Sequence, residues 1–231
     1  MKRVACRLFF GFAALAAAAL GASPDSHPNF TGYWELRFDS KNVPPAALTP
    51  MMAAEDRNVQ YQLDMKAIRW CHFLGVPYVM EGENLDILQN RNGTDIVISS
   101  ALRSPARHIY VDGRGHVNPD IFDPVSNGHS IGKWEGDTLV VDTVGFSSEG
   151  LTAIPGGGRR TPDSHLVERY RLVEGGNRLS VAFTWDDPKI FAKPHTYEFR
   201  YYRAPKGIEA REFDCNAADE GRAKFLSEPP K

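Results

Sequence analysis

The 231-residue sequence is poor in cysteine and holds one long apolar run, which lies at its N-terminal end. That run is shorter than the roughly 20 apolar residues that a membrane-spanning helix needs, and no second stretch reaches this length. The histidines form no H-x-H, H-x-x-x-H or H-E-x-x-H pair, so no metal site is predicted, and His116, His129 and His165 could meet only through the fold. No G-K-[ST] follows the glycine run at 156–158, which excludes a phosphate-binding loop. Ser130 lacks the strand-turn-helix setting that a nucleophile elbow requires.

The apolar run has the features of a secretory signal peptide. Lys2, Arg3 and Arg7 precede it, it spans Leu8–Leu20, and small residues lead out of it toward Ala22. We therefore expect residues 1–22 to be removed and residues 23–231 to form one domain, periplasmic or secreted. Removal changes the formal net charge from −2 to −5. An acidic domain attracts neither nucleic acid nor anionic lipid, so we expect no nucleic-acid partner and no membrane insertion after cleavage.

Cys71 and Cys215 are the two cysteines that remain after cleavage. An even pair in an oxidising compartment predicts a disulfide bridge. Because the bridge would close most of the domain, its loop entropy would contribute about 4–5 kcal/mol. Two separate buried thiols are the alternative.

Short alternating segments separated by turn residues recur along the chain. Hairpin turns are predicted at Asn92-Gly93, Gly136-Asp137 and Gly175-Gly176, each between two such segments. About ten strands are expected, the last at Glu209–Cys215. Short strands at regular spacing predict an all-β domain, either a barrel or a sandwich.

One helix and two long loops interrupt the strands. The helix is predicted to start at Thr49-Pro50, with Thr49 as its cap, and to run to about Lys66. The loops at 116–127 and 146–162 have the length of lids or binding loops.

The segment Asn127–Phe146 carries ionisable side chains on a predicted rigid hairpin. His129 and Lys133 are four residues apart on one strand, so their side chains share a face, and Trp134 lies on the other. His129 can act as a general base near neutral pH, and Lys133 can stabilise a developing anion. The alternative is a structural His129 bonded to a backbone carbonyl and a Lys133 whose ammonium reaches water.

Tyr110 and His165 complete the predicted catalytic set. Arg107 and Tyr110 lie on opposite faces of one predicted strand, and either could stabilise a phenolate or a carboxylate. Asp112 and Arg114 are expected to form an ion pair that braces a turn. His165 begins a strand close to the glycine-rich loop.

Aromatic side chains are expected to fill most of the interior. Those that remain accessible would line a cavity and select an aromatic ligand by stacking. The predicted ligand-binding residues are Trp34, Arg107, Trp134, Trp185 and Tyr197. Glu168 and Arg169 are expected to form cross-strand ion pairs instead.

Several blocks resemble a family of secreted bacterial proteins that is abundant in soil proteobacteria and acidobacteria, most with no established function. They are R-H-I-Y-V-D-G-R-G-H (107–116), G-H-S-I-G-K-W-E-G-D-T-L-V-V-D-T-V-G-F (128–146), S-H-L-V-E-R-Y-R (164–171), D-D-P-K-I-F-A-K-P (186–194) and Asp214-Cys215-Asn216. Gly32-Tyr33-Trp34 is also similar to the G-x-W start of calycin barrels. That likeness implies an antiparallel barrel whose mouth holds a small apolar ligand.

Two functions from different classes fit these observations. The first is a cofactor-independent lyase or isomerase acting on a small aromatic compound, one version being the loss of formaldehyde from a lignin-derived dimer. The second is a non-catalytic carrier of a hydrophobic aromatic ligand. The carrier needs the aromatic residues but not His129 and Lys133. The sequence does not predict the oligomeric state.

Overall fold

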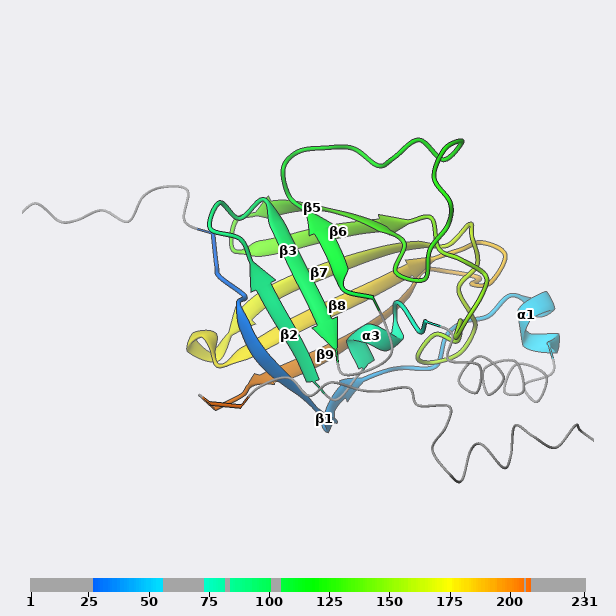
Figure 1. Cartoon of the computed structure of the whole chain (residues 1–231). Helices are drawn as coiled ribbons and strands as arrows, with labels where there is room; N and C mark the ends of the chain where they lie inside the picture. Colours follow the sequence, from blue (N-terminus) through cyan, green and yellow to red (C-terminus); the bar gives the residue numbers. More distant parts are fainter. Residues whose placement is uncertain (1–26, 56–72, 82–83, 101–104, 206, 209–231) are drawn as a thin grey trace, which may run out of the picture.

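The computed structural model describes residues 27–55, 73–81, 84–100, 105–205 and 207–208. Its strands form a closed barrel in which neighbours in sequence are neighbours in space and β1 pairs with β9 (Figure 1). The strands are β1 (Gly32–Asn42), β2 (Asn84–Gln89), β3 (Asp95–Ser100), β4 (Arg107–Tyr110), β5 (His129–Glu135), β6 (Thr138–Val144), β7 (His165–Val173), β8 (Arg178–Asp186) and β9 (His195–Arg203). The predicted all-β barrel is therefore confirmed.

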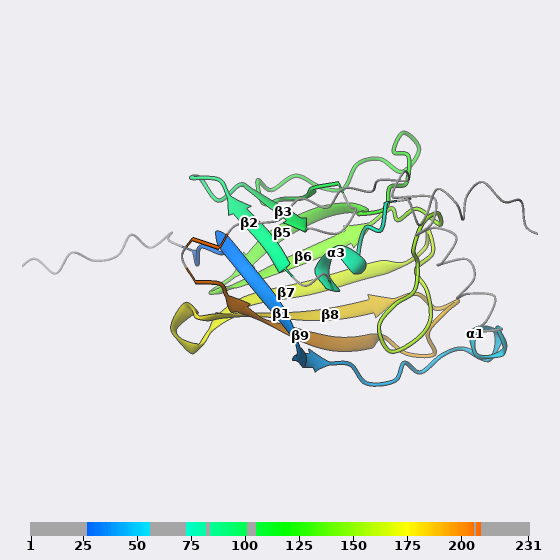
Figure 2. The ribbon, with the colours of Figure 1, turned by 60° about the horizontal axis from the view of Figure 1, so that its bottom comes forward.

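One strand pair departs from the predicted antiparallel arrangement. β4 and β5 pair in parallel, with Ile109 opposite Ser130 and Tyr110 opposite Ile131. Parallel neighbours require a crossover, which residues 111–128 provide. This crossover loop runs along the outside of the barrel to the end where residues 145–164 also lie (Figures 1 and 2). The barrel therefore contains both parallel and antiparallel strand pairs, because a crossover and not a hairpin joins β4 to β5.

The predicted turns lie where the sequence places them. Gly136 and Asp137 join the paired residues Glu135 and Thr138, and Gly136 has φ +64°. That positive φ is unstrained only for glycine, and a glycine in the first central position suits a two-residue hairpin. Short turns here fix the register of β5 against β6.

The predicted helix is shorter than expected, and a second helix is present. α1 (Pro50–Ala54) starts at Thr49, whose side chain accepts a hydrogen bond from the Met52 N–H, as predicted. It ends at Glu55, which is extended with ψ 132°, so the predicted continuation to Lys66 is wrong at this residue. α3 (Tyr78–Glu81) was not predicted. No helix in the described ranges has the length and apolar character needed to cross a bilayer.

Alternation along the strands fills the interior with apolar side chains. In β8, Leu179, Val181, Phe183 and Trp185 are fully buried, while the residues between them are half-buried. Met80 of α3 is also fully buried, and its carbonyl accepts a hydrogen bond of 2.5 Å from the Tyr201 hydroxyl. The core is therefore the barrel interior, with α3 packed against it.

The predicted disulfide and the predicted last strand lie outside the described residues. Cys71, Cys215 and the segment Glu209–Cys215 all fall in parts of the chain that the structure does not describe. Both remain predictions.

Candidate active site

Three polar side chains meet on the outer face of the barrel, one from each of three adjacent strands. Ser130 and Thr143 are buried, so their neighbours His129 on β5 and Asp142 on β6 point outward. Asp142 lies opposite Ile131 on β5 and Val167 on β7. His129 and His165 are each two residues beyond those partners, so they occupy diagonal positions on either side of Asp142. Diagonal neighbours in a sheet are about 7–8 Å apart, within reach of imidazole rings.

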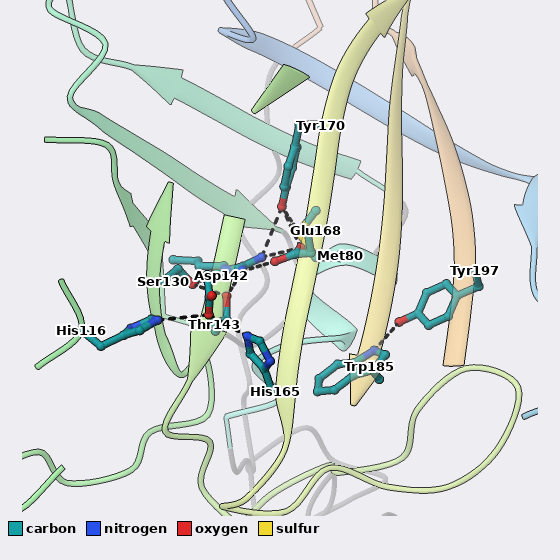
Figure 3. Close-up of polar contacts among 11 residues, drawn as sticks. Met80, His116, Ser130, Asp142, Thr143, His165, Glu168, Tyr170, Trp185 and Tyr197 are labelled. Atoms are coloured by element: carbon teal, nitrogen blue, oxygen red, sulfur yellow. Dashed lines mark hydrogen bonds and ion pairs between the residues drawn. The ribbon is translucent and has the colours of Figure 1, made fainter. Parts of the chain in front are cut away.

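His116 joins these residues from the crossover loop. Its Nε2 lies 3.1 Å from the Asp142 Oδ1, and its Nδ1 lies 2.9 Å from the Nδ1 of His129. The same Asp142 oxygen lies 2.8 Å from the Nε2 of His165 (Figure 3). We call His116, His129, Asp142 and His165 the histidine–aspartate cluster.

Hydrogen-bond valence fixes the protons of this cluster when its histidines are neutral. An ionised carboxylate only accepts, so His116 and His165 both donate from Nε2 to Asp142. The Nδ1 of His116 is then an acceptor, and His129 donates to it from Nδ1. The Nε2 of His129 therefore carries a lone pair, and it has no partner among the described residues. The relay therefore ends in one basic nitrogen, on the partly buried ring of His129.

The surroundings of His129 favour its neutral form. Burial lowers the pKa of the His129 imidazole below its ordinary value of 6.5, and nearby His116 and Arg114 lower it further. At neutral pH the ring is therefore unprotonated at Nε2, as a general base must be.

A histidine titration checks this directly. Monitored by NMR, His129 is expected to titrate below pH 6.5, the ordinary value. Because the unfolded chain takes up this proton first, the free energy of unfolding should fall as the pH drops from 6.5 through the folded-state pKa. A His129 that titrates above its ordinary value would contradict the assignment.

Aromatic rings surround His129. Tyr110 stacks on it with ring centroids 5.6 Å apart, and Phe122 meets it edge-on at 5.8 Å. The Arg114 guanidinium lies 4.0 Å from the Tyr110 ring centroid and forms the predicted ion pair with Asp112. The Tyr110 hydroxyl makes no hydrogen bond to any described residue. The structure thus brings Tyr110, His129 and His165 into one region.

Lys133 shares the outer face with His129 but does not join the cluster. It is exposed and has no hydrogen-bond or ion-pair partner in the described part of the chain. Four residues along a strand span about 13 Å. The two side chains are therefore not brought together.

Arg107 points into the barrel, where it forms a buried polar network (Figure 3 shows its other members). Its guanidinium donates to both carboxylate oxygens of Glu168, and also to Ser130 and Thr143. The Tyr170 hydroxyl donates to Glu168 at 2.8 Å. Burial lowers the pKa of the Arg107 guanidinium, but Glu168 and Tyr170 together raise it by more, so the pKa lies above its ordinary value and Arg107 stays charged.

Glu168 and Arg169 form ion pairs, as predicted, but on different faces. Glu168 pairs with Arg107 across the interior, and Arg169 pairs with Glu135 on the outer surface. The interior pair was not predicted, although alternation places both Arg107 and Glu168 on inward faces.

Ser130 occupies the third position of G-H-S-I-G at 128–132, the spacing of a nucleophile elbow. The structure places it within β5, 1% exposed, with its hydroxyl 3.0 Å from that of Thr143. No histidine contacts this hydroxyl among the described residues. It braces the core network and is not placed as a nucleophile.

Of the aromatic residues predicted to bind a ligand, Trp34, Trp185 and Tyr197 lie within the packed interior, and Trp134 is partly buried against it. Trp34 and Trp185 are fully buried, and the Trp185 indole donates to the Tyr197 hydroxyl at 3.1 Å (Figure 3). Trp134 stacks on Phe30 at 5.4 Å, at the mouth nearer the β5–β6 turn. Their contacts are those of core residues, and a ligand-binding role stays a prediction.

Sequence reasoning missed Asp142 and the part played by His116. The signal for Asp142 was the strand register, which sets it diagonally between His129 and His165. His116 had no comparable signal, because its position depends on the path of the crossover loop. Within the described ranges, no group of three or more His, Cys, Asp and Glu is arranged to hold a metal ion.

Comparison with known proteins adds no name to this geometry. Neither the scan against protein-family models nor the search of curated proteins gave a match. The resemblance to secreted soil-bacterial proteins therefore stays a prediction.

Proposed function

We propose that this protein is a cofactor-independent lyase or isomerase that moves a proton on a small aromatic compound, with His129 as the general base. The observation that carries the proposal is the relay from Asp142 through His116 to His129, which leaves the Nε2 of His129 with a lone pair and no partner among the described residues. The N-terminal signal-like segment supports action in the periplasm or outside the cell.

The relay gives the abstracted proton a stable destination. When the Nε2 of His129 takes a proton from a substrate carbon or hydroxyl, its Nδ1 proton moves to the Nδ1 of His116. The positive charge then rests on His116, whose Nε2–H already donates to the Asp142 carboxylate. An imidazolium beside a carboxylate is stabilised, so the proton taken from the substrate ends in a charge-paired position. The substrate is left as an enolate or phenolate.

Tyr110 and His165 supply the complementary groups. The Tyr110 hydroxyl is available to donate to the oxygen of a developing phenolate or enolate. The proton goes back to the product from the Nε2 of His129, while His165 donates its Nε2 proton to Asp142 and so helps to hold that carboxylate in place. A proton returned to a different atom gives an isomerase, and loss of a carbon fragment such as formaldehyde gives a lyase.

The surface around the cluster suits an aromatic ligand. Tyr110 and Phe122 present ring faces and edges next to His129, and planar ligands stack on such rings. The crossover loop, which carries Phe122, also exposes Val117, Ile121 and Val125.

Two measurements test the proposal. A thermal-shift screen of phenols and aromatic dimers should find a ligand that adds about 2.7 kcal/mol of stability at roughly 100 times its Kd. In D2O, the protein should then exchange the acidic proton of that ligand for deuterium or convert it to product. A ligand that binds without exchange or turnover would instead identify a carrier.

A further inference from the structure

Among the described residues, Arg160 is a buried cation without a carboxylate partner. Arg160 is 1% exposed, and its side-chain hydrogen bonds to the described part of the chain go to backbone carbonyls. The Nη1 donates to Val76 and, at 2.6 Å, to Ser126, and the Nη2 donates to Glu149 at 3.3 Å. Its Nε has no hydrogen-bond partner within the described ranges. Burial lowers the pKa of the guanidinium to about 10, so it stays charged at neutral pH.

The three carbonyls belong to three irregular segments at the same end of the barrel. Val76 lies in the segment before α3, and Ser126 lies at the end of the crossover loop. Glu149 lies between β6 and β7, as does Arg160 itself. A single guanidinium therefore links three segments, of which the crossover loop and the β6–β7 segment are also joined by the parallel bridge between Val125 and Phe146.

Two of these segments lead directly into the histidine–aspartate cluster. Ser126 is three residues before His129, and Arg160 is five residues before His165. The Ser126 carbonyl is also held by the Val76 N–H at 3.2 Å, and a Cβ added at Gly75 would lie 2.0 Å from it. The Ser126 carbonyl, just before β5, is therefore held by the Arg160 side chain and by the backbone at Gly75 and Val76.

We infer that Arg160 is a positioning residue, which sets the placement of His129 relative to His165 by tying the start of β5 to the start of β7. The importance of Arg160 for catalysis rests on the proposed function, but its effect on the position of His129 relative to His165 does not. Arginine suits this role because its planar, rigid fork of donors can reach several carbonyls at once. A lysine ammonium is a flexible point donor and cannot reproduce this geometry.

The test compares Arg160→Lys with Arg159→Lys. Arg159 is the preceding residue, pairs with Glu55 and is 40% exposed on its side chain, so its variant controls for the same substitution in the same loop. In Arg160→Lys, amide hydrogen exchange at Val125 and Gly128 should accelerate by about tenfold or more, because hydrogen bonds to a charged group are lost. The NMR pKa of His129 should rise toward its ordinary value as the ring gains water. Arg159→Lys should match the wild type in both.

A merely structural Arg160 would lower global stability and leave the His129 pKa and the local exchange unchanged in the folded protein, which would overturn the inference. If Arg160→Lys does not fold, amide hydrogen exchange of the wild-type protein tests the inference instead. The amides of Val76, Val125 and Arg160 must then open together with one free energy, and unequal values would overturn the inference. No measurement here uses turnover, so failure of the proposed reaction is distinguishable from failure of this role.

Discussion

Glu168→Gln is expected to lower the free energy of unfolding by about 3–5 kcal/mol, the cost of leaving one buried charge unpaired. The substitution keeps the side-chain volume but removes the carboxylate that neutralises Arg107. Arg107 and Glu168 are 1% and 0% exposed on their side chains, so water cannot replace the lost partner. Urea unfolding, with the midpoint and slope both measured, gives the change.

Glu135→Gln is the matched control. Glu135 forms the outer-surface pair with Arg169, and both side chains of this pair are about half exposed. An exposed pair contributes roughly 0–1 kcal/mol, so this variant should be close to wild type. Equal effects of the two substitutions would show that the interior pair is not the charge-neutral unit described above.

His129→Gln is expected to reduce turnover of the identified substrate by about two to four orders of magnitude, the usual contribution of a general base. Glutamine keeps a polar side chain on β5 but cannot accept the substrate proton. Ligand affinity should largely persist, because Tyr110 and Phe122 remain. Single-turnover rates and thermal-shift titrations separate the two effects.

His108→Gln controls for loss of a surface histidine. His108 lies on β4, is 46% exposed on its side chain and contacts Asp95 at 3.4 Å. Its variant should retain turnover. Wild-type turnover in His129→Gln would remove His129 from the mechanism, and loss of turnover in His165→Gln alone would assign the base to His165.

Local sequence signals predicted the barrel well where the chain forms short hairpins. Glycine-containing turns at Gly136 and Gly175 fix the register of their flanking strands, and alternation then gives the inward and outward faces. The same alternation correctly separated Arg107 from Tyr110. These local signals did not predict pairing between distant segments. Nothing in residues 111–128 indicates that the chain crosses over and pairs β5 in parallel with β4.

The candidate site was predictable in part for the same reason. His129, His165 and Tyr110 lie on strands whose faces follow from alternation. Asp142 required the register across three strands, and His116 required the path of the crossover loop. Lys133 was favoured because it shares a face with His129, but a shared face on an extended strand does not bring two side chains into contact.

Because β5 pairs in parallel with β4, we also expect the histidine–aspartate cluster to form late in folding. Hairpins form from nearby residues, whereas docking residues 111–128 across the barrel wall must wait until β4, β5 and β6 are in place. Before that step the chain contains all three histidines but no relay, because His116 has not met Asp142. A partly folded chain therefore lacks the relay from Asp142 through His116 to His129, which forms only once the crossover loop has docked.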